Sequence, residues 1–316
     1  MKEFLVRSEE IALMEYGRYP GSRSVDELVS NGIIILDKWQ GVTSRKVVEI
    51  IQKLFSAKKA GHSGTLDPNV SGVLPITLNN ACKAMPALQG LDKEYIGIMK
   101  LHKDANMPQI KSAMKRLTGV VTQTPPVKSA VARRPRQRHV YSFEMLEKND
   151  KDVLFRVSCQ AGTYVRLLCH KVGQILGVGA NMAELRRTRV GSFTEKDCIT
   201  LNDLEKALEQ WIDSANENIK EFIKPVEIVE DNIGTVIVKD SAIYTITHGS
   251  PLYATGISKI DKAILSDDKV ALMSLKGELI GLGTAKMNAT EMKRKKTLAV
   301  KTDRIIIDKK VYPKLR

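Results

Sequence analysis

The sequence predicts an α+β protein with a small β-barrel in its C-terminal part, and three observations support this fold class. Residues 31–38 read Asn-Gly-Ile-Ile-Ile-Leu-Asp-Lys, the pattern of a short buried strand that ends in a charged turn. Apolar side chains then recur at helical spacing. Beyond Pro225, short runs rich in valine and isoleucine alternate with glycines, as in small β-barrels. The length of 316 residues is enough for two domains.

Three helices are expected in the first part of the chain. The first follows the strand at 31–38 and starts at Thr43 or Ser44, either of which can cap its N-terminus. The second begins near Val165 and ends at Gly177. The apolar positions of the three helices are Val47, Val48, Ile51, Leu54 and Phe55; Val165, Leu168, Val172, Ile175 and Leu176; and Leu201, Leu204, Leu208, Trp211 and Ile212.

Strands dominate the C-terminal part of the sequence. The runs with strand composition cover residues 234–239, 270–276, 278–283 and 298–301. Glycines separate these runs, so the segment predicts the β-barrel named above.

The loop at residues 61–68 is the strongest candidate for a chemical site. It reads Gly-His-Ser-Gly-Thr-Leu-Asp-Pro, in which glycine permits tight or positive-φ turns and Pro68 keeps Asp67 out of a helix. A carboxylate presented on a rigid loop is what nucleophilic or acid–base chemistry requires. Two other interpretations remain open from the residues alone: an ordinary Asp-Pro turn, or a phosphate cradle at Gly61–Gly64.

The overall charge indicates an anionic partner. A formal net charge of +14 and a pI near 9.5 favour nucleic acid. Residues 133–138 and 293–296 are basic runs, although an isolated run of this kind is more often a solvated loop.

Cysteine and histidine usage limits the chemistry further. The four cysteines have no close pairing and the five histidines are scattered, so neither a metal site nor a disulfide framework is expected. No apolar run approaches the roughly 20 residues that span a bilayer, and residues 1–10 lack the apolar core of a signal peptide. We therefore expect a soluble, cytoplasmic protein.

An ordered series of motifs links these observations to a known family. After the loop at 61–68 come residues 93–97 (Lys-Glu-Tyr-Ile-Gly), 124–131, 162–166 (Gly-Thr-Tyr-Val-Arg) and 183–191. From about residue 30 to residue 230 this series resembles the TruB and dyskerin family of pseudouridine synthases. The resemblance implies a catalytic domain built on a mixed, largely antiparallel sheet flanked by helices.

The resemblance also divides the chain. Residues 243–256 resemble the start of a PUA domain, an RNA-binding module that commonly follows this catalytic domain. The expected parts are an N-terminal extension at 1–30 that docks on the PUA domain, the catalytic domain at 31–232, and the PUA domain at 233–316.

The resemblance assigns roles to particular residues. Asp67 is the carboxylate that attacks or assists at the uridine, Arg166 pairs with it because a buried carboxylate needs an opposite charge to stay ionised, and Tyr95 stacks on the extruded base. Leu185 lies beneath the base, and His62 fills the space that the nucleotide leaves in the RNA. Lys38 supports the catalytic loop. Taken singly, Tyr95 and Leu185 could be core residues, and Arg166 and Lys38 could be ordinary surface residues.

Pseudouridine formation breaks the bond between N1 of the base and the sugar and rejoins the base through carbon. No redox change occurs and no group is added, so no cofactor is expected. The reaction thus depends on the side chains alone.

Within the family, the sequence most resembles the archaeal dyskerin homologue. Lys128 stands where bacterial enzymes often have an aromatic residue, and the N-terminal extension and the end of the chain also match this branch. The implied setting is a box H/ACA ribonucleoprotein in which a guide RNA selects the rRNA uridine and three small core proteins complete the particle. The TΨC arm of tRNA is a second implied substrate.

Two alternative functions remain open, and two positions differ from the family pattern. The alternatives are a non-catalytic RNA-binding scaffold of the H/ACA particle and a base-excising glycosylase. The departures are Trp39, where the family commonly has proline after the motif lysine, and Pro135, where an aliphatic residue is usual. Both concern loop geometry more than chemistry.

Overall fold

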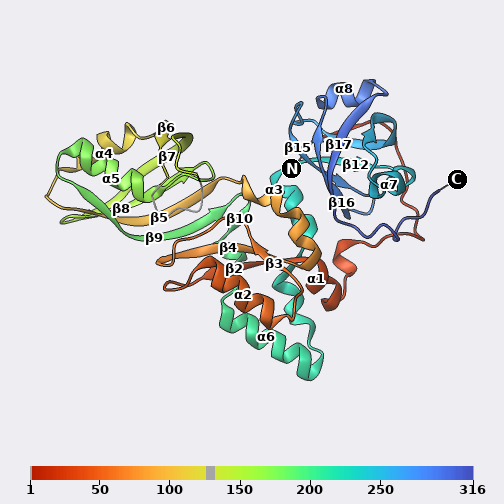
Figure 1. Cartoon of the computed structure of the whole chain (residues 1–316), viewed down its shortest axis with the longest axis horizontal. Coiled ribbons are helices and arrows are strands. Elements are labelled where there is room, and N and C mark those ends of the chain that lie inside the picture. Colours follow the sequence, from red (N-terminus) through yellow and green to blue (C-terminus); the bar gives the residue numbers. More distant parts are fainter. Residues whose placement is uncertain (1, 126–131, 316) are drawn as a thin grey trace.

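The computed structural model describes residues 2–125 and 132–315, arranged around two β-sheets (Figure 1). Most of the motif at 124–131, including Lys128, lies outside the described residues. The larger sheet carries the region that resembles a catalytic domain, and the smaller sheet is formed by the C-terminal region and a strand from the N-terminus.

The larger sheet is mixed and largely antiparallel, as the family resemblance implies. Its order is β11-β2-β4-β9-β5-β8-β7-β6, with β3 beside β4 and β10 beside β9; among its pairs, β4 and β9 are parallel. The ten strands are β2 (Gly32–Lys38), β3 (Ala60–His62), β4 (Val70–Leu78), β5 (Lys93–Leu101), β6 (Gly119–Gln123), β7 (Arg136–Asn149), β8 (Asp152–Cys159), β9 (Ala180–Val190), β10 (Phe193–Thr194) and β11 (Ile223–Pro225).

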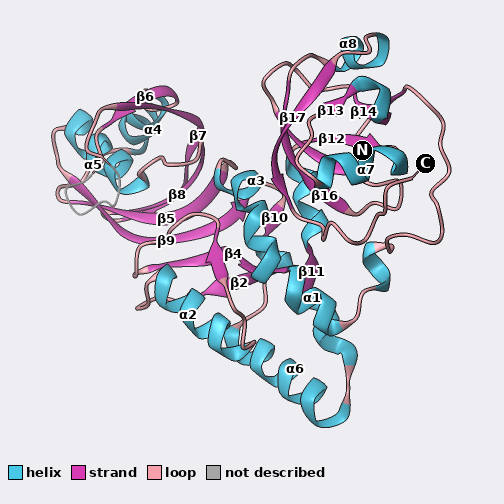
Figure 2. Cartoon of the chain, turned by 45° about the vertical axis from the view of Figure 1, so that its right-hand side comes forward, coloured by secondary structure: helices cyan, strands magenta, loops and turns pink. Residues whose placement is uncertain are grey.

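Helices flank this sheet in two groups. Near β5 and β8 lie α4 (Met107–Lys115) and α5 (Val165–Leu176), whereas α2 (Ser44–Leu54) and α6 (Leu201–Ser214) lie near β2 and β4 (Figure 2). The remaining α-helices of the described chain are α1 (Val25–Asn31), α3 (Met85–Gln89), α7 (Asp240–Thr247) and α8 (Ala289–Arg294). Each group buries its apolar stripe on one half of the sheet, which produces two separate cores.

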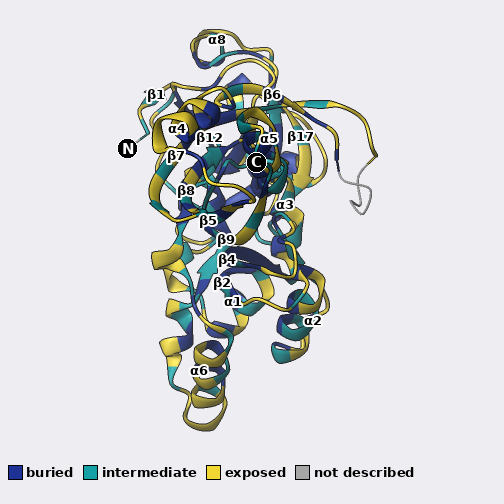
Figure 3. Ribbon diagram, turned by 90° about the vertical axis from the view of Figure 1, so that its left-hand side faces the viewer, coloured by how far each residue is buried: buried dark blue, intermediate teal, exposed yellow. Residues whose placement is uncertain are grey.

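The three predicted helices are confirmed, with differences at their margins. Thr43 caps α2 by accepting a hydrogen bond from the Lys46 N–H, and Gly177 ends α5 in the left-handed conformation at φ 69°. Two residues counted as apolar face are exposed instead: Ile175 at 37% and Ile212 at 68%. Figure 3 shows that α6 is exposed along much of its length, so no neighbour within the described ranges covers its far end.

The smaller sheet contains the predicted C-terminal strands. Its order is β1-β14-β12-β15-β16-β17-β13. These strands are β1 (Phe4–Val6), β12 (Gly234–Val238), β13 (Leu252–Tyr253), β14 (Ile257–Asp261), β15 (Lys269–Met273), β16 (Leu279–Ala285) and β17 (Leu298–Ile305). Strand β1 pairs with β14, at the opposite end of the sequence.

A shared apolar core joins the two sheets. Ile33 and Val73 of the larger sheet pack in one buried cluster with Met273, Leu279 and Leu282 of the smaller one. The C-terminal part therefore completes the packing of the larger sheet. None of the helices in the described ranges is long and apolar enough to cross a membrane.

Candidate active site

A cavity of about 460 Å³ collects the residues of the predicted site. It opens between the loop before β4, the N-terminus of α5, and strands β5 and β9. Its lining is Gly64, Thr65, Leu66, Asp67, Val70, Gln89, Lys93, Tyr95, Gly162, Thr163, Tyr164, Val165, Arg166, Met182, Leu185 and Arg187. Four of the predicted site residues therefore face one space, and the other two, His62 and Lys38, are not in this lining.

Asp67 and Arg166 form an ion pair across the cavity. The Asp67 Oδ2 lies 3.0 Å from the Arg166 Nη1, and the guanidinium also lies over the Tyr164 ring, 5.8 Å from its centroid. The Asp67 side chain is 48% exposed and that of Arg166 is 39% exposed. The expectation of a buried carboxylate is therefore wrong, because the loop holds Asp67 at the open mouth of the cavity.

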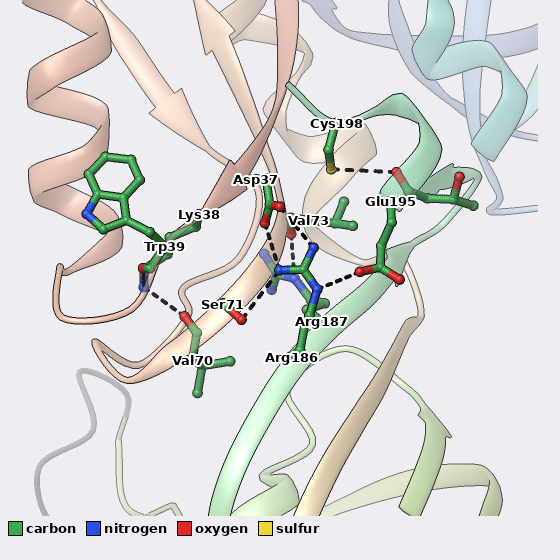
Figure 4. A network of polar contacts seen from close by, with 11 residues as sticks. Asp37, Lys38, Trp39, Val70, Ser71, Val73, Arg186, Arg187, Glu195 and Cys198 are labelled. Carbon is green, nitrogen blue, oxygen red and sulfur yellow. Dashed lines mark hydrogen bonds and ion pairs between the residues drawn. The ribbon is translucent and has the colours of Figure 1, made fainter. Parts of the chain in front are cut away.

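Lys38 fixes the loop on the C-terminal side of Asp67. Its side chain is fully buried, and its Nζ donates to the carbonyls of Trp39 (2.8 Å), Pro68 (3.0 Å) and Val70 (2.7 Å), as Figure 4 shows in part. Burial lowers the pKa of Lys38, and the nearby Asp67 opposes that shift. Trp39 contributes only a main-chain carbonyl to this clamp, so the departure from proline leaves the clamp intact.

Ser44 and Gly64 fix the N-terminal side of the same loop. The Ser44 hydroxyl accepts from the Leu66 N–H (2.8 Å) and donates to the Leu66 carbonyl (3.1 Å). Gly64 has φ 101°, a conformation that glycine adopts without strain. Ser44 and Leu66 are 22 positions apart in the sequence, so local patterns indicate Ser44 only as a possible helix cap and not as a partner of the loop.

The first two residues of the predicted loop at 61–68 belong to the sheet instead. Ala60–His62 form β3, which pairs antiparallel with β4, and the Ser63 N–H donates to the Pro75 carbonyl at 3.1 Å. A phosphate cradle needs main-chain N–H groups that converge on an empty space. Here the main chain of the segment pairs with β4 instead, which argues against the phosphate-cradle interpretation.

Arg187 is a central residue that was not predicted from the sequence. It is 1% exposed, and its guanidinium donates to the carbonyls of Val73 (2.8 Å) and Gly64 (3.2 Å) and interacts with the Tyr95 hydroxyl. Burial lowers the pKa of Arg187 and raises that of Tyr95, and each of the two groups partly opposes the shift of the other. Strand alternation was the available signal, since Arg187 lies two residues beyond Leu185 and shares its face of β9.

The adjacent Arg186 points to the opposite face. Figure 4 shows it between Asp37 and Glu195, and its two terminal nitrogens lie 2.9 Å from the two Asp37 carboxylate oxygens. This bidentate pair ties β9 to β2 beneath the cavity. It is a structural contact outside the cavity lining.

The other two predicted residues have clear positions. Leu185 is buried and lines the cavity, whereas His62 ends β3, before the loop that carries Asp67. The His62 Nδ1 is buried without a hydrogen-bond partner in the described chain, and burial lowers the pKa of the imidazole. Nothing in this geometry tests the roles assigned to these side chains, which stay predictions.

Family models match almost the whole chain. Residues 1–48 match the DKCLD (NUC011) domain, and residues 52–165 match the N-terminal domain of the TruB family pseudouridylate synthases. Residues 166–229 match the C-terminal domain of tRNA pseudouridylate synthase B, and residues 234–306 match the PUA domain.

Curated relatives are similar over their full length. A probable tRNA pseudouridine synthase B of Archaeoglobus fulgidus is 40% identical over 100% of this chain and 98% of its own. The protein of the same description from Thermococcus onnurineus is 44% identical over 99% of this chain and 95% of its own.

Solved structures match the whole fold. A chain in the crystal structure of a Cbf5-Nop10-Gar1 complex is 43% identical, with a TM-score of 0.95 over 100% of this chain and 97% of its own. A chain in the structure of an H/ACA RNP bound to a substrate RNA containing 2'-deoxyuridine is 41% identical, with a TM-score of 0.94 over 100% and 98%. At these identities the likeness extends beyond the fold.

Proposed function

Because the chain belongs to the TruB family of pseudouridine synthases, with a PUA domain and a DKCLD domain, we propose that it isomerises uridines in rRNA that a box H/ACA guide RNA selects. The observation that carries this proposal is the Asp67–Arg166 pair at the mouth of a cavity lined by Tyr95 and Leu185. The structural neighbour from an H/ACA RNP supports the guided reaction. The names of the curated relatives support tRNA as a further substrate, and we propose its TΨC arm as the target.

Asp67 is the carboxylate that reacts or assists at the uridine. Its loop is clamped on one side by Lys38 and on the other by Ser44, so the carboxylate is preorganised with little freedom to lose. Arg166 orients it through a charge-assisted contact, and RNA that covers the cavity would remove the water that now screens the pair.

The cavity suits an extruded pyrimidine. Flipping a base out of an RNA stack costs a few kcal/mol, and stacking on an aromatic face recovers part of that cost. Tyr95 provides the aromatic face and Leu185 an apolar surface below it. His62, which is outside the lining, is proposed to occupy the space that the flipped nucleotide vacates.

The remaining parts of the chain serve RNA binding and assembly. We assign residues 31–232 to catalysis, residues 233–316 to a PUA domain that binds guide RNA, and residues 1–30 to an extension that docks on the PUA domain. The β1–β14 pairing and the hydrogen bond from the Lys276 Nζ to the Tyr16 carbonyl (2.6 Å) support the docking. The partners would be the three small H/ACA core proteins, and the location cytoplasmic.

A tritium-release assay tests this function. RNA labelled with tritium at C5 of uridine loses the label when C5 bonds to the sugar, so release counts the isomerisation. The assay is run with the guide RNA and core proteins, with each omitted in turn, and with unguided tRNA. A non-catalytic scaffold would bind the RNA and release no tritium, and a glycosylase would release free base.

A further inference from the structure

The cavity contains two buried cations apart from the Asp67–Arg166 pair. Lys93, at the start of β5, is 5% exposed, and Arg187 of β9 is 1% exposed. Lys93 belongs to the motif that contributes Tyr95, but the family resemblance assigns it no role. Both side chains line the same cavity as Asp67.

The two cations converge beside the catalytic loop. A Cβ built on Gly64 would lie 3.6 Å from the Arg187 Nη1 and 3.9 Å from the Lys93 Nζ, so both nitrogens approach the same point. These are ordinary van der Waals distances, so the methyl group of an alanine at position 64 would contact both side chains. The positive charges are therefore neighbours at the base of the loop that carries Asp67.

Neither cation has a carboxylate partner in the described chain. The Lys93 Nζ donates to the main-chain carbonyls of Gln89 (3.3 Å) and Leu91. Arg187 donates to those of Gly64 and of Val73, and Figure 4 shows the contact with Val73. Asp67 is paired with Arg166. An ammonium group has three N–H donors, so one donor of Lys93 remains for a ligand oxygen. Burying a charge without an opposite charge beside it costs free energy. Buried titratable groups of this kind cluster at functional sites.

We propose that Lys93 and Arg187 form a cationic floor that stabilises the negative charge on the uracil ring after its bond to the sugar breaks. The inference rests on the proposed function. When the C1′–N1 bond breaks, its electron pair stays with N1 and spreads onto the O2 and O4 carbonyls, while Asp67 supports the electron-poor C1′. After the base turns, an electron pair at C5 forms the C5–C1′ bond, the C5 hydrogen leaves as a proton, and N1 gains a proton.

This arrangement favours the reaction over simple binding. Bound uridine is neutral, whereas the detached ring is anionic, so fixed positive charge acts mainly after bond cleavage. Lys93 is the testable member of the pair, because Arg187 also holds the loop through Gly64 and would disturb the fold if replaced.

The protonation state of Lys93 supplies an independent readout. Burial and the neighbouring Arg187 lower the pKa of Lys93 to about 8, and Cys159 and Asp92 partly oppose the shift. Lys93 is therefore cationic below about pH 8 and neutral above it. Burial raises the pKa of Cys159 to about 11 and raises that of Tyr95, so neither titrates in the same window.

The test compares single-turnover rates of the wild type, Lys93→Met and Lys93→Arg in the assembled particle. At pH 7, Lys93→Met should be slower by about 100-fold at unchanged RNA affinity, since removing one donor to a developing anion has that order of effect. The wild-type rate should fall above pH 8 toward the Lys93→Met rate, and Lys93→Arg should show no such fall. The matched control is Lys100→Met, at an exposed position of the same strand.

A second substrate separates charge stabilisation from a structural role. Fluorine at C5 withdraws electrons and stabilises the uracil anion, so RNA with 5-fluorouridine should show a much smaller ratio of wild-type to Lys93→Met rates, measured by mass spectrometry of the digested nucleosides. Equal ratios for both substrates, or a pH profile that Lys93→Met leaves unchanged, would overturn the inference. Wild-type turnover of uridine RNA tests the proposed function separately.

Discussion

Arg166→Lys separates the orientation of Asp67 from mere charge pairing. Both partners of the 3.0 Å contact are partly exposed, at 39% and 48%, and exposed ion pairs contribute about 0–1 kcal/mol to stability. Lysine keeps the charge, so the free energy of unfolding should change by less than about 1 kcal/mol. The effect should therefore appear in the reaction and not in the fold.

The expected kinetic effect is far larger. Lysine lacks the planar fork that fixes a carboxylate, and a displacement of about 1 Å at a reacting group costs about 100-fold in rate, or about 2.7 kcal/mol. Single-turnover tritium release at saturating enzyme measures this decrease, while thermal unfolding and RNA titration check the fold and the affinity.

A matched control is Arg18→Lys, which alters an exposed 2.8 Å ion pair with Glu27 outside the cavity lining and should leave the rate unchanged. A rate for Arg166→Lys within about threefold of the wild type would refute the orienting role.

Three further changes test the loop, the sheet and the C-terminal domain. Lys38→Met removes the donor to three carbonyls and should lower the free energy of unfolding by about 1–3 kcal/mol in chemical denaturation, unlike the exposed Lys46→Met. Gly72→Ala should lower the free energy of unfolding by more than about 2 kcal/mol, because φ is 105° and the new Cβ would lie 2.1 Å from the Arg187 carbonyl oxygen. Gly41→Ala, which is also at positive φ but in open space, should lower it by less. Replacing the basic side chains at 293, 294 and 296 by glutamine should lower the salt-dependence slope of RNA binding by about 0.7–0.9 for each phosphate that these side chains neutralise in the wild type, with turnover at saturation unchanged.

Local sequence patterns predicted part of the fold. Strand β2, helices α2, α5 and α6 and the C-terminal strands follow from periodicity, capping residues and glycine positions. The patterns identify an apolar stripe but not the neighbour that covers it, which is why Ile175 and Ile212 were counted as apolar face and are exposed. Coverage depends on packing between segments distant in sequence.

The candidate site was predicted only in part. Motif resemblance brought Asp67, Tyr95, Arg166 and Leu185 together, and the structure gathers these four around one cavity. Ser44 and Arg187 were missed because their contacts with the loop span 22 and 123 residues, and a serine at a helix start or an arginine in a basic strand has a commoner explanation. The exposure of Asp67 was also unpredictable, since it depends on how far the loop lies from the sheet.

Tritium release by the assembled particle, compared between the wild type and Asp67→Asn, tests the central claim most directly. Phosphate contacts provide most of the RNA affinity, so Asp67→Asn should bind guide and substrate RNA nearly as tightly as the wild type. The account predicts label release by the wild type and none above background by the variant. Substantial release by Asp67→Asn at wild-type affinity would contradict the assignment of Asp67.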